Sequence, residues 1–208
     1  MKAKLAIRKT LALMCIAFAM PVFSLAQELS KQEKDYALQL LQTTKEKFLF
    51  QIEDLTPEQW NYKTDSLHWS IAECSEHIAI SEKTLLSLVN KLMADPANSA
   101  MRAEMKYKTE DLVKMVQNRS VKAKAPEMLK PTHRWKNEED LMAEFETDRQ
   151  KTIDFMKLAN NEVNTHLMQH PVFGYLDAYQ WVVLLAAHSS RHTAQIMEIK
   201  SSKGYPKL

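Results

Sequence analysis

Residues 177–201 read DAYQWVVLLAAHSSRHTAQIMEIKS, and this stretch predicts a long helix that begins after an aspartate cap. Trp181, Leu184 and Leu185 recur at helical spacing and share one face with His188 and His192. An imidazole on an apolar face costs free energy unless a partner satisfies its nitrogens. A divalent metal ion would satisfy both rings at once, and hydrogen bonds to facing helices are the alternative. The spacing of four residues leaves both interpretations open.

The rest of the sequence favours an all-α protein. Two glycines and 12 methionines among 208 residues are typical of long helices with few tight turns. Helix-start signals stand at Ser30, Ser70, Asn137 and Asp177, and apolar residues follow each of them at helical spacing. We therefore expect four long helices, over residues 30–54, 71–93, 137–159 and 177–201, packed in one bundle.

Two irregular regions interrupt this pattern. Residues 95–137 carry one short helix, expected over 110–119 with Thr109 as its cap, and then an extended crossing marked by Pro126 and Pro131. Such a long connection is typical of a bundle with a crossover. Residues 160–176 hold a second histidine pair, His166 and His170, beside Pro171. We expect these two rings to line a loop where water solvates them.

The N-terminus has the features of a secretory signal peptide. Four basic residues precede an apolar run over residues 11–20, and Ser24-Leu25-Ala26 forms a cleavage site with small residues at its ends. The run is too short to span a membrane. We therefore divide the chain into a signal peptide, residues 1–26, and one mature domain, residues 27–208, in the periplasm or outside the cell.

Removal of this segment changes the charge of the protein. Lys plus Arg falls from 28 to 24 against 26 acidic residues, so the formal charge changes from +2 to −2. The mature chain has no basic excess that would indicate a nucleic-acid partner, and we expect no stable membrane insertion. We expect a small molecule as the partner, and a homodimer is one further alternative.

Several side chains could complete a metal site with His188 and His192. His77 lies on the second long helix, on a mixed face where a histidine is usually structural. Cys74, one turn earlier, could be a ligand, a nucleophile or a small buried apolar side chain, and the last is the usual role of a lone thiol. Trp69 and Trp181 are expected in the core, with one of them as a wall of the site.

Short motifs in the chain resemble the DinB-like (YfiT-like) family of metal-binding four-helix bundles. They are residues 55–60 (LTPEQW), 69–79 (WSIAECSEHIA), Ala125-Pro126, Lys130-Pro131, 170–174 (HPVFG) and 188–195 (HSSRHTAQ). The resemblance covers the chain from about Ser30 to Lys200. It implies an up-down-down-up bundle, and it implies that His77, His188 and His192 are the metal ligands. The family is mostly cytoplasmic, so an export signal is a departure from it.

Two kinds of function are compatible with this resemblance, a metal-dependent enzyme and a non-catalytic metal-binding protein. Some relatives are thiol S-transferases that use bacillithiol, or mycothiol-dependent isomerases, but export disfavours cytosolic thiols here. Three imidazoles would leave a divalent ion (Zn, Ni or Fe) open for water or a thiol, as in a metal-dependent hydrolase or S-transferase. The alternative is a non-catalytic exported metal-binding or scaffold bundle. Glu73, Glu76 and Gln195 are the candidate acceptors for the second ring nitrogen of each ligand, and for Glu73 a capping role is favoured.

Overall fold

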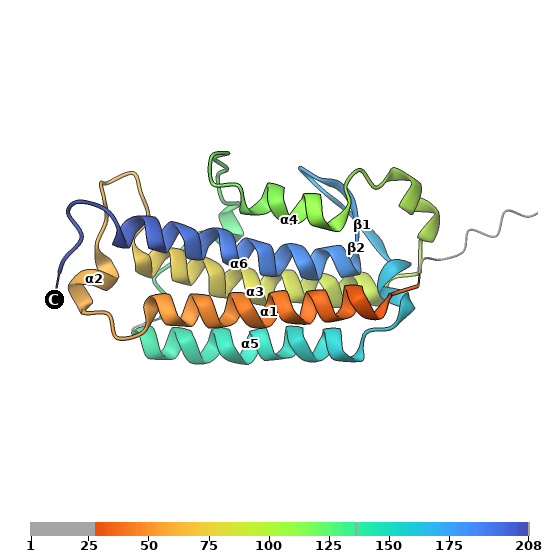
Figure 1. Ribbon diagram of the computed structural model, residues 1–208, viewed down its shortest axis with the longest axis horizontal. Coiled ribbons are helices and arrows are strands. Elements are labelled where there is room, and N and C mark those ends of the chain that lie inside the picture. Colours follow the sequence, from red (N-terminus) through yellow and green to blue (C-terminus); the bar gives the residue numbers. More distant parts are fainter. Residues whose placement is uncertain (1–27, 136, 208) are drawn as a thin grey trace, which may run out of the picture.

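The computed structural model describes residues 28–135 and 137–207 and shows four long helices in this part of the chain (Figure 1). They are α1 (Lys31–Ile52), α3 (Ile71–Ala94), α5 (Glu138–Leu158) and α6 (Ala178–Lys200). The chain direction in Figure 1 is the same in α1 and α6 and opposite in α3 and α5. The up-down-down-up bundle is therefore confirmed.

The helices begin where the sequence offers side-chain caps. Ser30, Thr56 and Ser70 each accept a hydrogen bond from the backbone N–H three residues later, and the side chain at that position returns the bond. The caps of α1 and α3 are thus as predicted, and the short α2 (Pro57–Asn61) begins with a cap of the same kind. At α6 the Asp177 side chain accepts a hydrogen bond from the backbone N–H of Gln180. The Gln180 side chain donates to the Tyr107 carbonyl and does not return a hydrogen bond to Asp177.

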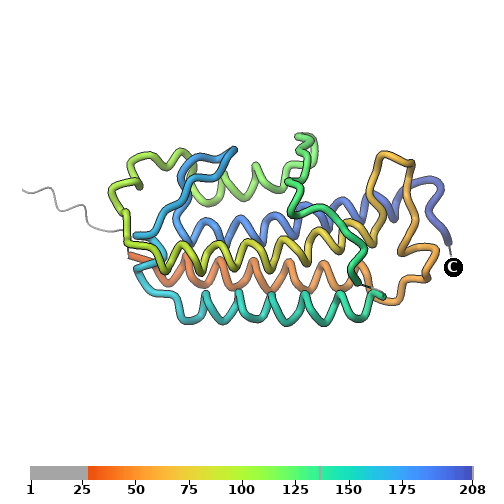
Figure 2. The backbone as a smooth tube through the Cα atoms, turned by 180° about the vertical axis from the view of Figure 1, so that it is seen from behind, coloured from red at the N-terminus to blue at the C-terminus, as the bar shows by residue number. Residues whose placement is uncertain are grey.

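The crossover from α3 to α5 carries three short helices and covers α6. They are the 3₁₀ helix η1 (Ser99–Glu104), α4 (Thr109–Gln117) and the 3₁₀ helix η2 (Glu127–Leu129). The predicted helix over 110–119 begins one residue earlier, at Thr109, and its cap is Lys108. Figure 2 shows the chain after α4 running across α3 toward the start of α5.

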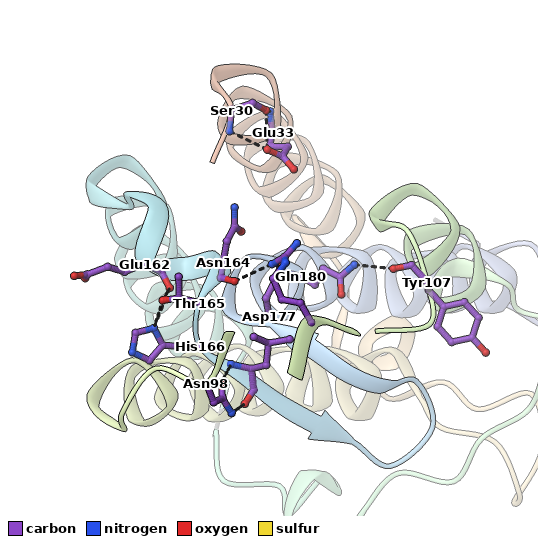
Figure 3. A network of polar contacts seen from close by, with 12 residues as sticks. Ser30, Glu33, Asn98, Tyr107, Glu162, Asn164, Thr165, His166, Asp177 and Gln180 are labelled. Atoms are coloured by element: carbon purple, nitrogen blue, oxygen red, sulfur yellow. Dashed lines mark hydrogen bonds and ion pairs between the residues drawn. The ribbon is translucent and has the colours of Figure 1, made fainter. Parts of the chain in front are cut away.

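The expectation of a loop over residues 160–176 is wrong. This segment forms the 3₁₀ helix η3 (Asn161–Asn164) and an antiparallel hairpin of β1 (Leu167–His170) and β2 (Gly174–Asp177). Gly174 has φ +75°, a conformation that other residues adopt at a cost, and it closes the turn. Asn98 holds the outer edge of β1 through hydrogen bonds with the backbone N–H and C=O of Leu167 (Figure 3).

The core lies around α6, which packs against α1, α3 and α4. Its first ten residues, Ala178 to Ala187, are all buried, so this half of the helix has no solvent-exposed face. Deeper in the bundle, Arg149 of α5 is fully buried and donates to both carboxylate oxygens of Glu82 on α3, at 2.9 and 2.7 Å. Within the described residues, no helix is both long and apolar enough to cross a membrane. The predicted signal peptide lies outside them.

Candidate metal centre

Two helices far apart in the sequence bring three histidines together. His77 lies in the second turn of α3, and His188 and His192 lie one turn apart in α6, which is packed against α3. The ring centroids are 4.4 to 4.9 Å apart, and the Nε2 atoms of His77 and His188 are separated by 3.2 Å. Among residues 28–135 and 137–207, this is the one group of three or more potential metal-ligating side chains that the fold assembles.

Hydrogen bonds orient two of the three rings. His77 Nδ1–H donates to the backbone carbonyl of Leu129 at 2.7 Å, and His192 Nδ1–H donates to Gln195 Oε1 at 3.0 Å. With the proton on Nδ1, Nε2 of each of these two rings carries the lone pair that can bind a metal ion. His77 Nε2 also lies within hydrogen-bonding distance of His188 Nε2, at 3.2 Å. Gln195 was among the predicted acceptors. Leu129 was missed because it is a backbone group 52 residues away, and no side-chain pattern signals it.

The environment keeps all three imidazoles neutral. Burial lowers the pKa of His77, and burial together with the neighbouring His192 and His77 holds the pKa of His188 well below its usual value. Burial and the proximity of His77 lower the pKa of His192 to about 3. Neutral imidazole is the form that binds a metal ion, so the cluster needs no deprotonation near pH 7.

The geometry of these atoms fits a metal ion. Two nitrogens at about 2.0–2.1 Å from one tetrahedral ion lie about 3.3 Å apart, and the His77 and His188 Nε2 atoms are 3.2 Å apart. The donor atoms of all three residues lie within 4.8 Å of one another. Three imidazoles complete no closed four-ligand shell, so such an ion would keep a position for another molecule.

Trp69 forms one wall of this cluster. Its indole ring centroid is 5.0 Å from that of His77 and 6.2 Å from that of His192. Trp181 lies two turns before His188 and is 4 % exposed, and its ring contacts His170 at a centroid distance of 5.2 Å. Of the two tryptophans, Trp69 therefore lies against the histidine cluster, and Trp181 is part of the core.

The two nearby glutamates hold other parts of the structure. Glu73 closes the cap of α3 at Ser70 and pairs with Lys63 at 2.7 Å, in agreement with the favoured capping role. Glu76 accepts hydrogen bonds from the backbone N–H groups of residues 132, 133 and 134. It thereby fixes the crossover segment that supplies the Leu129 carbonyl to His77. The two glutamates were predicted to accept a hydrogen bond from a histidine of the cluster. For His77, the Leu129 carbonyl takes this role instead.

Cys74 and the second histidine pair lie outside the cluster. Cys74 is fully buried in the apolar core, and burial raises the pKa of its thiol far above the usual value, so it fits the role of a small apolar side chain. His166 is 8 % exposed, and its Nδ1 lies 2.9 Å from the Glu162 carbonyl. His170 Nδ1 accepts from the backbone N–H groups of Val172 and Phe173. Groups of the protein itself therefore contact both Nδ1 atoms, where water was expected; for His166 they include the Thr165 hydroxyl at 3.1 Å (Figure 3).

Comparison with known proteins agrees with this architecture. Residues 40–196 match the family model of the DinB superfamily. The uncharacterized protein YuaE from Bacillus subtilis (strain 168) is 27 % identical over 150 residues, which are 72 % of this chain and 88 % of YuaE. The fold is similar to that of YfiT from Bacillus subtilis, described as a probable metal-dependent hydrolase with an unusual four-helix bundle topology. That match has a TM-score of 0.57 and 16 % identity, and it covers 86 % of this chain and 91 % of YfiT.

Proposed function

The chain belongs to the DinB superfamily, and from its histidine cluster we propose that it is a metal-dependent hydrolase with His77, His188 and His192 as the ligands. The observation that carries this proposal is the convergence of three imidazoles, two of them with Nε2 atoms 3.2 Å apart. The description of the structural neighbour YfiT as a probable metal-dependent hydrolase supports the same reaction class.

The ligand set favours a divalent ion such as Zn, Ni or Fe, since imidazole suits all three. When bound, such an ion acts as a Lewis acid on water or substrate at the position that the protein leaves open.

The residues around the imidazoles prepare the site. The Leu129 carbonyl and Gln195 fix the orientation of two rings, so little ordering is needed when an ion binds. Trp69 shields the His77 and His192 rings from solvent on one side. The buried Cys74 thiol is unsuited to attack a substrate, which disfavours a nucleophilic role for this protein's own cysteine.

A second candidate function is metal binding without catalysis. Hydrolysis usually needs a carboxylate or histidine that transfers a proton beside the ion. Glu73 and Glu76, the nearest carboxylates on α3, are both engaged in hydrogen bonds elsewhere. This observation favours the non-catalytic alternative.

Metal analysis and hydrolysis assays test these two functions. We expect about one equivalent of divalent metal in the purified protein and its loss, with at least a hundredfold weaker affinity, in His77→Ala, His188→Ala and His192→Ala. His166→Ala and His170→Ala are the matched controls and should bind within a few-fold of the unmodified protein. Metal-dependent cleavage of nitrophenyl esters would support the hydrolase, and full metal occupancy without any cleavage would favour the binding protein. A metal requirement for His166 and His170 in place of His188 and His192 would overturn both.

Export of the protein to the periplasm or beyond is part of this proposal and rests on the sequence of residues 1–26. N-terminal sequencing of the protein from its native cells should then begin within one or two residues of Gln27. Recovery from the cytoplasm with Met1 in place would refute export, and it would restore cytosolic thiols as candidate cosubstrates.

A further inference from the structure

The acidic residues near the histidine cluster are already matched by positive charges. Within two turns of a ligand histidine, α3 carries Glu73, Glu76 and Glu82, and α6 carries Glu198. Their cationic partners are Lys63 at 2.7 Å, Arg134 at 3.8 Å, Arg149 at 2.7 Å and Arg119 at 2.8 Å, respectively. In the crossover segment that contacts His77, Glu127 pairs with Lys130. No carboxylate in this set is left to balance the charge of a metal ion.

Positive charge is present in excess at the same place. Arg191 is adjacent to His192, and its guanidinium donates to the backbone carbonyls of Val116, Asn118 and Val121. Among the ion pairs of the described residues, none involves Arg191. These carbonyls bind the guanidinium without neutralising it. Arg191 therefore adds a full positive charge beside the cluster.

A second arginine reaches the cluster through a shared acceptor. Arg119 Nη1 donates to Gln195 Oε1 at 3.2 Å, the oxygen that also accepts from His192 Nδ1–H. Arg119 also binds both carboxylate oxygens of Glu198, at 3.1 and 2.8 Å. Arg119, Arg191 and Glu198 together carry a net charge of +1. Burial and His77 are the main causes of the lowered pKa of His192, and both arginines lower it further.

A divalent ion bound by three neutral imidazoles would add two more positive charges beside Arg119 and Arg191. Partly buried charges are screened less than exposed ones, so an uncompensated excess at this position is costly. A ligand that brings a negative charge removes part of this cost, whereas a neutral ligand does not. The positive charge of Arg191 therefore increases the difference in binding free energy between an anionic and a neutral ligand.

We infer that the open position beside His77, His188 and His192 selects an anionic group, and that Arg191 sets this preference. The substrate of the proposed hydrolase would accordingly carry a carboxylate, phosphate or thiolate group close to the reacting bond. The inference rests on the proposed function, because it requires a metal ion at the three histidines.

Anion binding to the Co²⁺-loaded protein tests the inference without an activity assay. Visible absorption of the Co²⁺ protein is titrated with azide, an anion, and with imidazole, a neutral ligand. In Arg191→Gln, whose amide can still donate to a carbonyl, we expect azide affinity to fall about tenfold, the effect of one partly buried charge nearby. Imidazole affinity should stay within about twofold.

Two further variants separate charge from a structural effect. Arg191→Lys keeps the charge and should retain azide affinity within about threefold of the unmodified protein. Glu198→Gln removes a negative charge from the same cluster and should tighten azide binding about threefold, a gain that a disordered site would not produce. Parallel titrations with acetate, phosphate and 2-mercaptoethanol identify which anionic group binds most tightly.

The outcomes distinguish this inference from the proposed function. Equal losses of azide and imidazole affinity in Arg191→Gln, or an unchanged azide affinity in both Arg191→Gln and Glu198→Gln, would overturn the anion preference while Co²⁺ still binds. A protein that takes up no Co²⁺ would instead overturn the proposed function itself.

Discussion

Acidification of the metal-free protein tests whether the ligand imidazoles are held neutral by the fold. The perturbation is a change from pH 7.5 to pH 5.5 in the presence of a chelator. His192 has a pKa of about 3 in the folded protein because it is buried beside His77, whereas an unfolded histidine titrates near 6.5. Below pH 6.5 the unfolded chain therefore binds a proton at this position that the folded chain does not bind.

The sign and size of the effect follow from this difference. Stability decreases as the pH falls from about 6.5 toward 3, since the unfolded state gains protons over this range. At pH 5.5 a group with an unfolded pKa of about 6.5 is about 90 % protonated in the unfolded chain, which corresponds to about 1.4 kcal/mol. The pKa of His188 is lowered in the same direction, and that ring adds at most about as much again.

The assay is urea unfolding at both pH values for the unmodified protein, His192→Gln and the double variant His188→Gln/His192→Gln. For each protein, the loss of unfolding free energy between pH 7.5 and pH 5.5 is measured. The loss in the variant is then subtracted from the loss in the unmodified protein. This subtraction removes the opposite contribution of Glu138, whose pKa is raised to about 7 by burial and by Asp54 and Glu53. We expect a difference of about 1.4 kcal/mol for the single variant and at most about 2.8 kcal/mol for the double variant. A difference below about 0.5 kcal/mol in both would refute neutral, desolvated imidazoles.

Three further substitutions have defined outcomes. Cys74→Ser should keep full metal occupancy by elemental analysis, because the buried thiol lies outside the cluster; a tenfold weaker affinity would make Cys74 a ligand. Gln195→Leu should weaken metal binding about 10- to 100-fold in calorimetric titration, since it removes the acceptor of His192 Nδ1–H, and unchanged affinity would contradict that role. Glu82→Gln should lower the unfolding free energy by about 3–5 kcal/mol in urea, because the Arg149 charge stays buried without its partner. The control Glu82→Gln/Arg149→Met should regain part of the lost unfolding free energy, because the unpaired charge is gone. A loss under about 1 kcal/mol in Glu82→Gln would argue against a costly unpaired Arg149 charge.

The long helices could be predicted because their signals are local. Ser30 and Ser70 with their glutamate partners, and Asn137 with its acidic first turn, place three helix starts at the observed residues. The apolar stripes were equally informative, since Leu141, Phe145, Ile153 and Met156 are all buried. These features depend on residues a few positions apart, which a sequence displays directly.

The hairpin and the hydrogen bonds of the site depend on partners distant in the chain. The β1 and β2 strands have four residues each, too short for a clear alternating pattern, and Asn98 pairs with β1 across 69 residues. The Leu129 carbonyl that accepts from His77 belongs to the crossover segment, which Glu76 holds through the backbone N–H of Thr132. The two histidine pairs have equal spacing, but their sequence contexts differ: His188 and His192 lie on the apolar face of a capped helix, whereas Pro171 follows His170. The structure adds that the first pair meets His77 and that the second lies around the hairpin.

The position of α6 at the end of the chain has a consequence for biosynthesis. This helix supplies His188 and His192 and packs against α1, α3 and α4. A nascent chain that stops before Ala178 would contain one of the three proposed ligands, His77, and would expose the apolar surfaces that α6 covers. Neither the complete bundle nor its histidine cluster can form before α6 has emerged. Folding of the bundle, and with it the proposed metal binding, should therefore wait until α6 has been translated.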